Sequence, residues 1–302
     1  MFFIPTLFLS LLVAVLPVAA SSTGYQDTGG SQEEKTSWSE GGCVPVTDVS
    51  CGDSLAYQAG EKLVFTMHYR WGSIDSDVGW ANVVLDTTRL NGTKTFHTMV
   101  FGRTTRLFDI FFKVRENFQS WFTYDGLQPL RFTRDTHEGK YVARNTYTYR
   151  RGDMAQDHIA AEVYTSSKGD QSLELPLDKC TFDLPALFYF ARNMDFDKVV
   201  PEVKYPMTFA IDEDIYNVYF ILRGRETINV KGLGTVRAIK FSAKLLSGNV
   251  FTGDADLDVW ISDDENRIPV LFEAPILVGV ASGRLKSAEG LKHPFSSLTN
   301  RK

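Results

Sequence analysis

The chain holds few residues whose types and spacing could carry chemistry. It has five histidines, and none of them forms the His-Glu-x-x-His pattern of a metalloprotease helix. A nucleophile elbow, a phosphate-cradling loop and a dinucleotide fingerprint are also missing from the sequence. His68 and His97 fall at polar positions of predicted strands, where a hydrogen-bonded strand histidine is the ordinary explanation. We therefore predict no catalytic residue, no cofactor and no enzymatic activity.

Three carboxylates are the best candidates for a metal site. Asp254, Asp256 and Asp258 alternate along a predicted strand, so they would share one face and could hold Ca²⁺. The alternative is a plain solvated face of the strand. We favour the solvated face and predict no metal site. A paired-carboxylate hydrolase would need two acids at a set separation, and the sequence identifies no such pair.

The beginning of the chain predicts export. Residues 1–20 are uncharged, carry an apolar run and end in Val18-Ala19-Ala20, which is typical of a cleaved signal peptide. The alternative is a membrane anchor, but the run is short for a span and Pro17 interrupts it. After cleavage we expect a soluble protein of the periplasm or the extracellular space. Residues 21–50 are polar and predict a disordered linker.

Charge and cysteine content narrow the classes further. The net charge is -5, so a nucleic acid is not an expected partner. Cys43, Cys51 and Cys180 are the three cysteines, and an exported chain favours a disulfide between two of them. Cys43–Cys51 would close a short loop, whereas Cys51–Cys180 would tie the start of the domain to its middle.

Period-two patterning fills most of the chain after residue 60. In the first segment, apolar side chains alternate with more polar ones, namely Leu63, Phe65, Met67, Tyr69 and Trp71. Further strands are predicted at 79–86, 96–101, 118–124, 130–135, 141–149, 205–211, 216–222, 235–246, 257–261, 269–273 and 276–285. The pattern predicts one all-β domain over 51–290, mainly an antiparallel barrel, half-barrel or sandwich, with a tail at 291–302.

One helix is predicted between the two series of strands, over 183–193. Asp183 suits the N-cap and Pro185 the first turn. Four apolar residues then follow at helical spacing, namely Leu184, Leu187, Phe188 and Ala191. We expect this helix to plug or cap the β structure.

Several phrases in the sequence resemble a known family. They include Gly60-Glu61-Lys62-Leu63, Tyr69-Arg70-Trp71-Gly72, Phe190-Ala191-Arg192-Asn193 and the run Val259 to Pro269. Their order is similar to that in the bacterial family called domain of unknown function 3108, and the likeness extends over roughly 51–285. It is greatest to exported members from Bacteroides-like bacteria. The resemblance implies a YmcC-like β-barrel or half-barrel and transfers no catalytic residues.

The resemblance also bears on two covalent features. Cys51 and Cys180 lie inside the matching region and Cys43 does not, which favours a Cys51–Cys180 disulfide. Exported proteins of that bacterial group are O-glycosylated at Asp-Ser/Thr-apolar sites. Asp53-Ser54-Leu55 fits this pattern, so Ser54 is a glycosylation candidate.

Basic and aromatic residues gather at 103–115. The cluster consists of Arg103, Arg106, Phe108, Phe111, Phe112, Lys113 and Arg115. One interpretation is an amphipathic stretch that touches lipid headgroups or an acidic glycan. The other, which we favour here, is a strand or loop with its aromatics in the core and its basic residues in water.

The aromatic-rich strands predict a function. Of all residues, 13% are aromatic, and a curved sheet so rich in them either packs solid or leaves an apolar cavity. The first hypothesis is a non-catalytic binding module for an apolar or amphiphilic, lipid-like ligand. Its candidate lining is Phe65, Met67, Tyr69, Trp71, Phe122, Tyr147 and Phe209. The alternatives are an accessory of envelope or capsule assembly that acts through a partner protein and, more remotely, a glycan hydrolase.

Overall fold

The computed structural model describes residues 54–152, 156–178, 180–245, 257–276 and 279–301. Strands dominate these residues. The first half contains β1 (Lys62–Trp71), β2 (Ile74–Leu90), β3 (Thr93–Thr104), α1 (Arg106–Asp109), β4 (Val114–Thr123), β5 (Pro129–Glu138), β6 (Tyr141–Arg150), β7 (His158–Thr165) and β8 (Gly169–Pro176). The second half contains β9 (Thr181–Phe182), α2 (Leu184–Ala191), β10 (Lys204–Ile211), β11 (Asp214–Val230), β12 (Gly234–Leu245), β13 (Leu257–Ser262), β14 (Pro269–Pro275), β15 (Val280–Glu289) and β16 (Leu298–Arg301).

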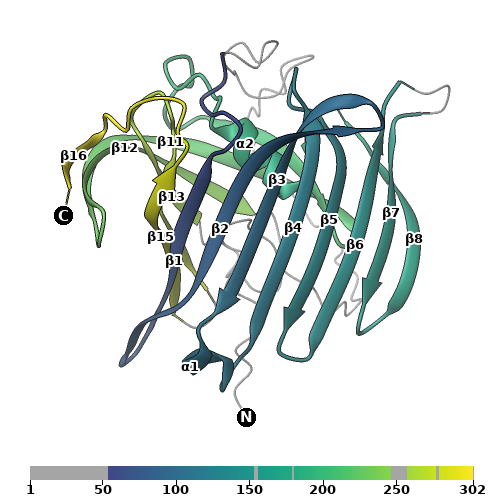
Figure 1. Ribbon diagram of the computed structural model, residues 1–302, viewed down its shortest axis with the longest axis horizontal. Coiled ribbons are helices and arrows are strands. Elements are labelled where there is room, and N and C mark those ends of the chain that lie inside the picture. The colour runs from purple at the N-terminus through teal and green to yellow at the C-terminus, as the bar shows by residue number, and fades with distance from the viewer. Residues whose placement is uncertain (1–53, 153–155, 179, 246–256, 277–278, 302) are drawn as a thin grey trace, which may run out of the picture.

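All these strands belong to one sheet, in which most strands pair with their neighbours along the chain (Figure 1). The order runs from β8 back to β1, continues through β15 and then descends to β9, with β16 added beside β12. The antiparallel ladder between β1 and β15 therefore joins the two halves. Within the described residues, β9 and β10 form the one parallel pair. The predicted all-β, largely antiparallel fold is confirmed.

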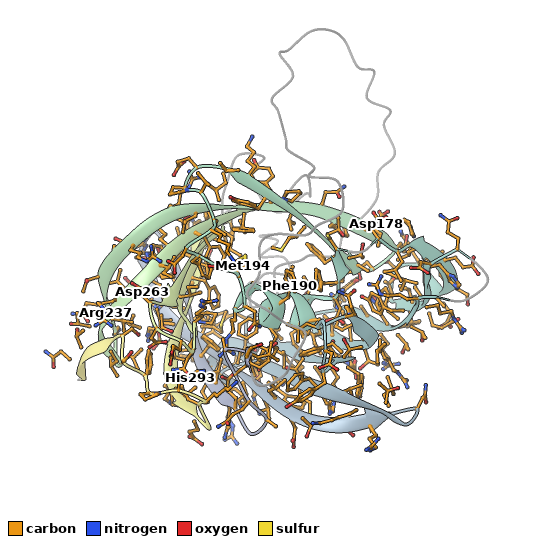
Figure 2. The ribbon with its side chains drawn as sticks, turned by 90° about the horizontal axis from the view of Figure 1, so that it is seen from above. Asp178, Phe190, Met194, Arg237, Asp263 and His293 are labelled. Atoms are coloured by element: carbon orange, nitrogen blue, oxygen red, sulfur yellow. The ribbon has the colours of Figure 1, made fainter. Side chains whose placement is uncertain are left out.

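The sheet curls until its two ends approach each other. Seen from above, the strands of the second half arch over one side of α2, and those of the first half lie on its other side (Figure 2). Lys168 Nζ lies 2.5 Å from Glu213 Oε2, which ties the β7–β8 turn to the β10–β11 turn. Phe190 and Met194 are buried inside this half-barrel.

The hairpins follow the turn chemistry of the sequence. Leu90 pairs with Thr93 across a two-residue turn, in which Asn91 and Gly92 have φ angles of 49° and 84°. These positive φ angles are those of the turn that matches the twist of paired strands, and Asn and Gly adopt them at low cost. The Asn-Gly signal thus positions β2 against β3 as predicted.

The predicted helix is also present. Asp183 is its N-cap and accepts a 2.8 Å hydrogen bond from the Ala186 backbone N–H, while Pro185 stands in the first turn. The helix ends at Ala191, and Arg192 is its C-cap. A cap side chain and an early proline both favour a helix beginning at this point.

The end of the chain departs from the prediction. Residues 291–302 were expected to form a tail, but β16 pairs with β12 and extends the sheet. Asn266 Nδ2 donates to the carbonyls of His293 (3.0 Å) and Pro294 (3.1 Å), and Asp264 Oδ2 accepts from the Ser297 N–H (3.1 Å). These side-chain hydrogen bonds fasten the segment to the β13–β14 turn, which local patterning does not reveal.

Two predictions fall on residues 1–50, namely the signal peptide and the linker, and lie outside the described residues. In the part of the chain that the structure describes, no helix has the length and apolar character to cross a membrane.

Candidate ligand-binding cavity

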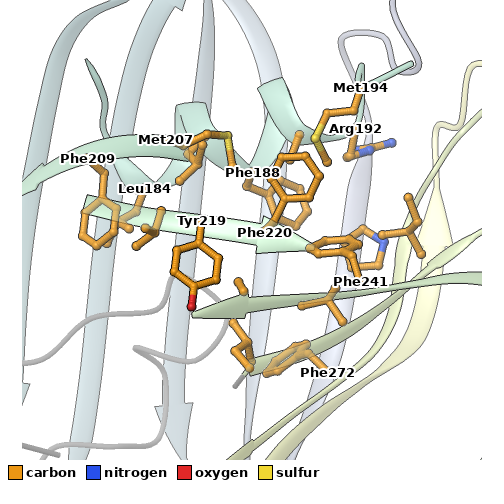
Figure 3. A pocket seen from close by; sticks show the side chains of 18 residues that line it. Leu184, Phe188, Arg192, Met194, Met207, Phe209, Tyr219, Phe220, Phe241 and Phe272 are labelled. Atoms are coloured by element: carbon orange, nitrogen blue, oxygen red, sulfur yellow. The ribbon is translucent and has the colours of Figure 1, made fainter. Parts of the chain in front are cut away.

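The two faces of α2 meet different surroundings. One face packs tightly, because the Tyr189 ring lies 4.7 Å from Tyr57 and 5.9 Å from Phe122, and Phe190 lies 4.4 Å from Phe182. The opposite face carries the predicted stripe of Leu184, Leu187, Phe188 and Ala191. This second face looks toward the inner surface of β10–β14, and a cavity separates them (Figure 3).

The cavity has a volume of about 150 Å³, and almost all of its surface is apolar. Its outer wall consists of alternate residues on paired strands, for example Phe220 opposite Ala243 and Phe241 opposite Val259. The full lining is Leu184, Leu187, Phe188, Ala191, Arg192, Met194, Met207, Phe209, Val218, Tyr219, Phe220, Phe241, Ala243, Leu257, Val259, Ile261, Pro269 and Phe272.

Several wall residues are only partly buried although they lie inside the half-barrel. These residues include Leu187, Phe188, Ala191, Phe241 and Val259. In a close-packed interior such side chains would lose their accessible surface almost entirely. Apolar cavities of roughly 150 Å³ stay dry and accept small apolar molecules. The arrangement can therefore hold an apolar group.

A buried ion pair positions α2. Arg192 Nη1 lies 2.5 Å from Glu61 Oε1, and Nη2 lies 2.8 Å from Oε2. The guanidinium also donates to the Asn266 carbonyl and lies over the Tyr57 ring, 5.1 Å from its centre. Since Glu61 already neutralises Arg192, the cavity presents no free cation to an anionic ligand.

The structure distributes the predicted lining residues over three places. Phe209 lines the cavity. Phe65, Met67 and Tyr69 point inward from β1 but are fully packed, and the Phe65 ring lies 6.2 Å from that of Phe272.

Phe122 and Tyr147 lie on the first-half side of the interior, where Phe122 packs against Tyr189 and Tyr147 against Phe132. Trp71 is 43% exposed, so its expected inward position is corrected. It stands at the end of β1, next to the β1–β2 turn at the lower end of the sheet (Figure 1).

Pattern analysis did not identify most of the wall as lining. Phe188 and Ala191 were recognised as a helical stripe, but Phe241 and Val259 lie in strands whose inner and outer faces both carry apolar residues. The sequence does contain both an apolar helix stripe and aromatic-rich strands. No sequence pattern, however, shows that the stripe and these strands face each other across a cavity.

A polar cluster occupies another part of the interior, among β4, β5, β6 and the β10–β11 turn. Arg134 Nη1 lies 2.7 Å from Asp212 Oδ1, and the Tyr147 hydroxyl donates to the Asp212 carbonyl at 2.8 Å. Thr136 donates to Glu116, and burial raises the pKa of both Glu116 and Glu138. The two carboxyl side chains are at most 4% exposed, so a polymer substrate cannot reach them.

Only some of the residues predicted for the metal site and for the disulfide lie in the part of the chain that the structure describes. Asp254 and Asp256 lie outside the described residues, and Asp258 pairs with Lys240 at 2.8 Å. No cluster of three or more His, Cys, Asp or Glu residues suited to a metal ion occurs in the described ranges. Cys180 is disulfide-bonded. Because Cys51 lies outside those ranges, its pairing with Cys180 stays a prediction.

Ser54 is exposed, and its glycosylation also stays a prediction. His68 and His97 have ordinary strand partners: His97 Nε2 lies 3.0 Å from Gln119 Oε1, and His68 lies between Asp75 and Asp77.

Comparison with known proteins places the fold. The family DUF3108, described as a protein of unknown function, matches residues 64–286, so the chain belongs to this family. The structure is similar to a β-barrel-like protein of the family DUF1849 from Brucella abortus, with a TM-score of 0.50 and 10% identity. That match covers 77% of this chain and 98% of the other, and it shows a shared fold.

Two further solved structures resemble this chain less. A protein described as exported, with a YmcC-like fold, from Bacteroides fragilis has 8% identity and a TM-score of 0.34, over 82% of this chain and all of its own. A protein described as a lipoprotein from Parabacteroides distasonis has 8% identity and a TM-score of 0.33 over the same shares. No curated protein matches the chain.

Proposed function

We propose that this protein is a non-catalytic binding module of the cell envelope that holds the apolar chain of an amphiphile between α2 and β10–β14. One observation supports it most strongly: Leu187, Phe188 and Ala191 on the inner face of α2 stay only partly buried and line a cavity in front of the strands. Burying apolar surface in that space would be favourable by about 25 cal/mol per Å². We propose export to the periplasm or the extracellular space as the setting.

The size and charge of the cavity define the ligand class. Pockets for whole drug-sized ligands are roughly 300–1,000 Å³, which is larger than this cavity. A single acyl chain, entering in part, suits the space better than a complete two-chain lipid. Because Arg192 is bound to Glu61, the polar head of the ligand would remain outside the apolar wall.

The experiment uses two cavity-filling variants, Ala191→Leu on α2 and Ala243→Leu on β12, together with their double variant. Uptake of a fluorescent long-chain fatty acid is titrated and then competed with palmitate. We expect saturable uptake by the wild type and at least a tenfold loss in the double variant, because the added side chains occupy the space of the chain.

Ala160→Leu is the matched control. Ala160 is half-buried on the outer face of β7, away from the cavity lining. It should leave uptake unchanged. Equal uptake by the wild type and the double variant, or no uptake at all, would contradict the proposal.

A further inference from the structure

Exposed apolar side chains gather at one end of the half-barrel. Leu107 (65% exposed), Ile110 (77%) and Phe111 (78%) project from α1 and the residues after it. Trp71 (43%) and Ile74 (37%) lie in the β1–β2 hairpin at the same lower end in Figure 1, and α1 contacts β2. Elsewhere in the described residues, large exposed apolar side chains are limited to Phe101, Val200 and Val203.

This end is held in a fixed shape. The Thr105 backbone N–H donates to the Val78 carbonyl at 2.8 Å, which fastens the start of α1 to β2. Arg115 holds Asp109 with two hydrogen bonds, of 2.9 Å and 2.5 Å. Phe108 and Phe112 pack against the core. Because Phe108 and Phe112 point inward, the neighbouring side chains of Leu107, Ile110 and Phe111 point outward into solvent.

The charge carried by the α1 stretch of the chain is positive. Residues 103–115 contain Arg103, Arg106, Lys113 and Arg115 against the single acid Asp109, a formal charge of +3 in a chain of -5. Arg115 neutralises Asp109 and holds the pKa of that carboxyl at about 2. Arg106 and Lys113 are exposed beside the apolar side chains. An apolar tip with a rim of cations is complementary to an anionic lipid surface.

We propose that residues 105–113, the α1 tip, dock this protein on the surface of an anionic lipid bilayer. Leu107, Ile110 and Phe111 enter the boundary between headgroups and acyl chains, and Arg106 and Lys113 pair with the headgroups. A monomeric protein rarely exposes several large apolar side chains together without such a contact. The inference concerns a surface separate from the cavity and does not depend on the proposed ligand.

The test is flotation of the purified protein, from which the predicted signal peptide has been removed, with vesicles of phosphatidylcholine alone or mixed with phosphatidylglycerol. We expect binding to the anionic vesicles, weaker binding at high salt, and little binding to neutral ones. The variant Leu107→Ser/Ile110→Ser/Phe111→Ser should lose binding by at least about tenfold. Arg106→Glu/Lys113→Glu should also lose about tenfold, through headgroup contacts alone.

Val200→Ser/Val203→Ser is the matched control, because it removes exposed apolar side chains away from the tip. It should bind vesicles like the wild type. All variants are compared for thermal unfolding, which exposed substitutions should leave nearly unchanged. Absence of wild-type binding, equal loss in the control, or a wild-type dimer without lipid that the triple variant abolishes would overturn the proposal. The last result would mean that the tip binds a second copy.

Discussion

Arg192 and Glu61 form a fully buried, bidentate ion pair, although they are 131 positions apart in the sequence. It joins the C-terminal end of α2 to the first residue before β1, and thereby fixes the helix that forms one wall of the cavity. Both residues belong to phrases by which the sequence resembles its family. The pair gives those phrases a structural role, because it ties the end of α2 to the beginning of β1.

Removing one partner of this pair should destabilise the fold strongly. Arg192→Met leaves the Glu61 carboxylate buried without its cation, which costs roughly 3–5 kcal/mol. Urea unfolding measures the loss, and the double variant Glu61→Gln/Arg192→Met should recover part of it. Lys198→Met removes an exposed partner of Asp195 and should leave the urea midpoint nearly unchanged. Similar losses for Arg192→Met and Lys198→Met would contradict this role.

Asp183 should make stability depend on pH. Burial raises its pKa from 3.8 to about 7, against the hydrogen bonds from the Ala186 N–H and the Ser120 hydroxyl. The folded state therefore binds this proton more tightly than the unfolded state, so stability declines as the pH rises from about 4 to about 7.

Asp183→Asn keeps an N-cap acceptor and removes the charge, so its free energy of unfolding should fall less between pH 4 and 8 than that of the wild type. Asp183→Ala should lose about 1 kcal/mol through the missing cap. Parallel pH profiles for the wild type and Asp183→Asn would contradict the assignment.

Glu116 and Glu138 should also make the protein less stable as the pH rises, as Asp183 does. Burial is the main cause that raises both pKa values, and the negative charge of Glu138 raises that of Glu116 further. Ionisation is therefore unfavourable in the folded state, and stability is lost as the pH rises above the ordinary glutamate range.

Glu116→Gln should be more stable relative to the wild type at pH 8 than at pH 5, as measured by urea unfolding at both values. Glu162→Gln, at an exposed position of β7, should show no such difference. A Glu116→Gln variant equally destabilised at both pH values would show that the carboxylate is needed in its charged form.

The predicted disulfide has a direct test. Peptide mapping without reduction should find Cys51 linked to Cys180 and leave Cys43 as a free thiol. Closing a loop of this length should contribute about 3–5 kcal/mol, so reduction should lower the urea midpoint clearly. A Cys43–Cys180 peptide would instead overturn the pairing that the family resemblance favours.

Filling the cavity should not harm the fold. Ala191→Leu and Ala243→Leu place methyl groups in empty space, and cavity filling commonly adds roughly 0.5–2 kcal/mol of stability. The same change in a packed site costs about 1–3 kcal/mol, so Ala81→Leu on β2, which is fully buried, is the contrasting variant. Destabilisation of all three by similar amounts would mean that the space is not available.

The strands and the helix could be predicted from the sequence better than the residues that each of them packs against. In β1, the alternation of Leu63, Phe65, Met67 and Tyr69 identified the inward face, because a pleated strand with one buried face must alternate. β7 and β8 were not predicted. β8 is an edge strand of mainly polar residues, and Leu175 is its one buried residue.

The interior could be predicted only in part. The stripe Leu184, Leu187, Phe188 and Ala191 marked the face of α2 that lines the cavity, although the same periodicity is typical of an ordinary core helix. Arg134 and Glu116 occupy inward positions that patterning assigns to apolar side chains, because their partners come from other strands and from Asp212 in a distant turn. Long-range pairing of this kind leaves no local sequence pattern.

Native mass spectrometry of the full chain tests the central claim most directly. The wild type, as purified or after incubation with palmitate, should carry one single-chain amphiphile, and Ala191→Leu/Ala243→Leu should carry none under the same conditions. A wild-type spectrum without any such adduct before and after incubation would contradict the account, as would an adduct of equal abundance in the cavity-filled variant.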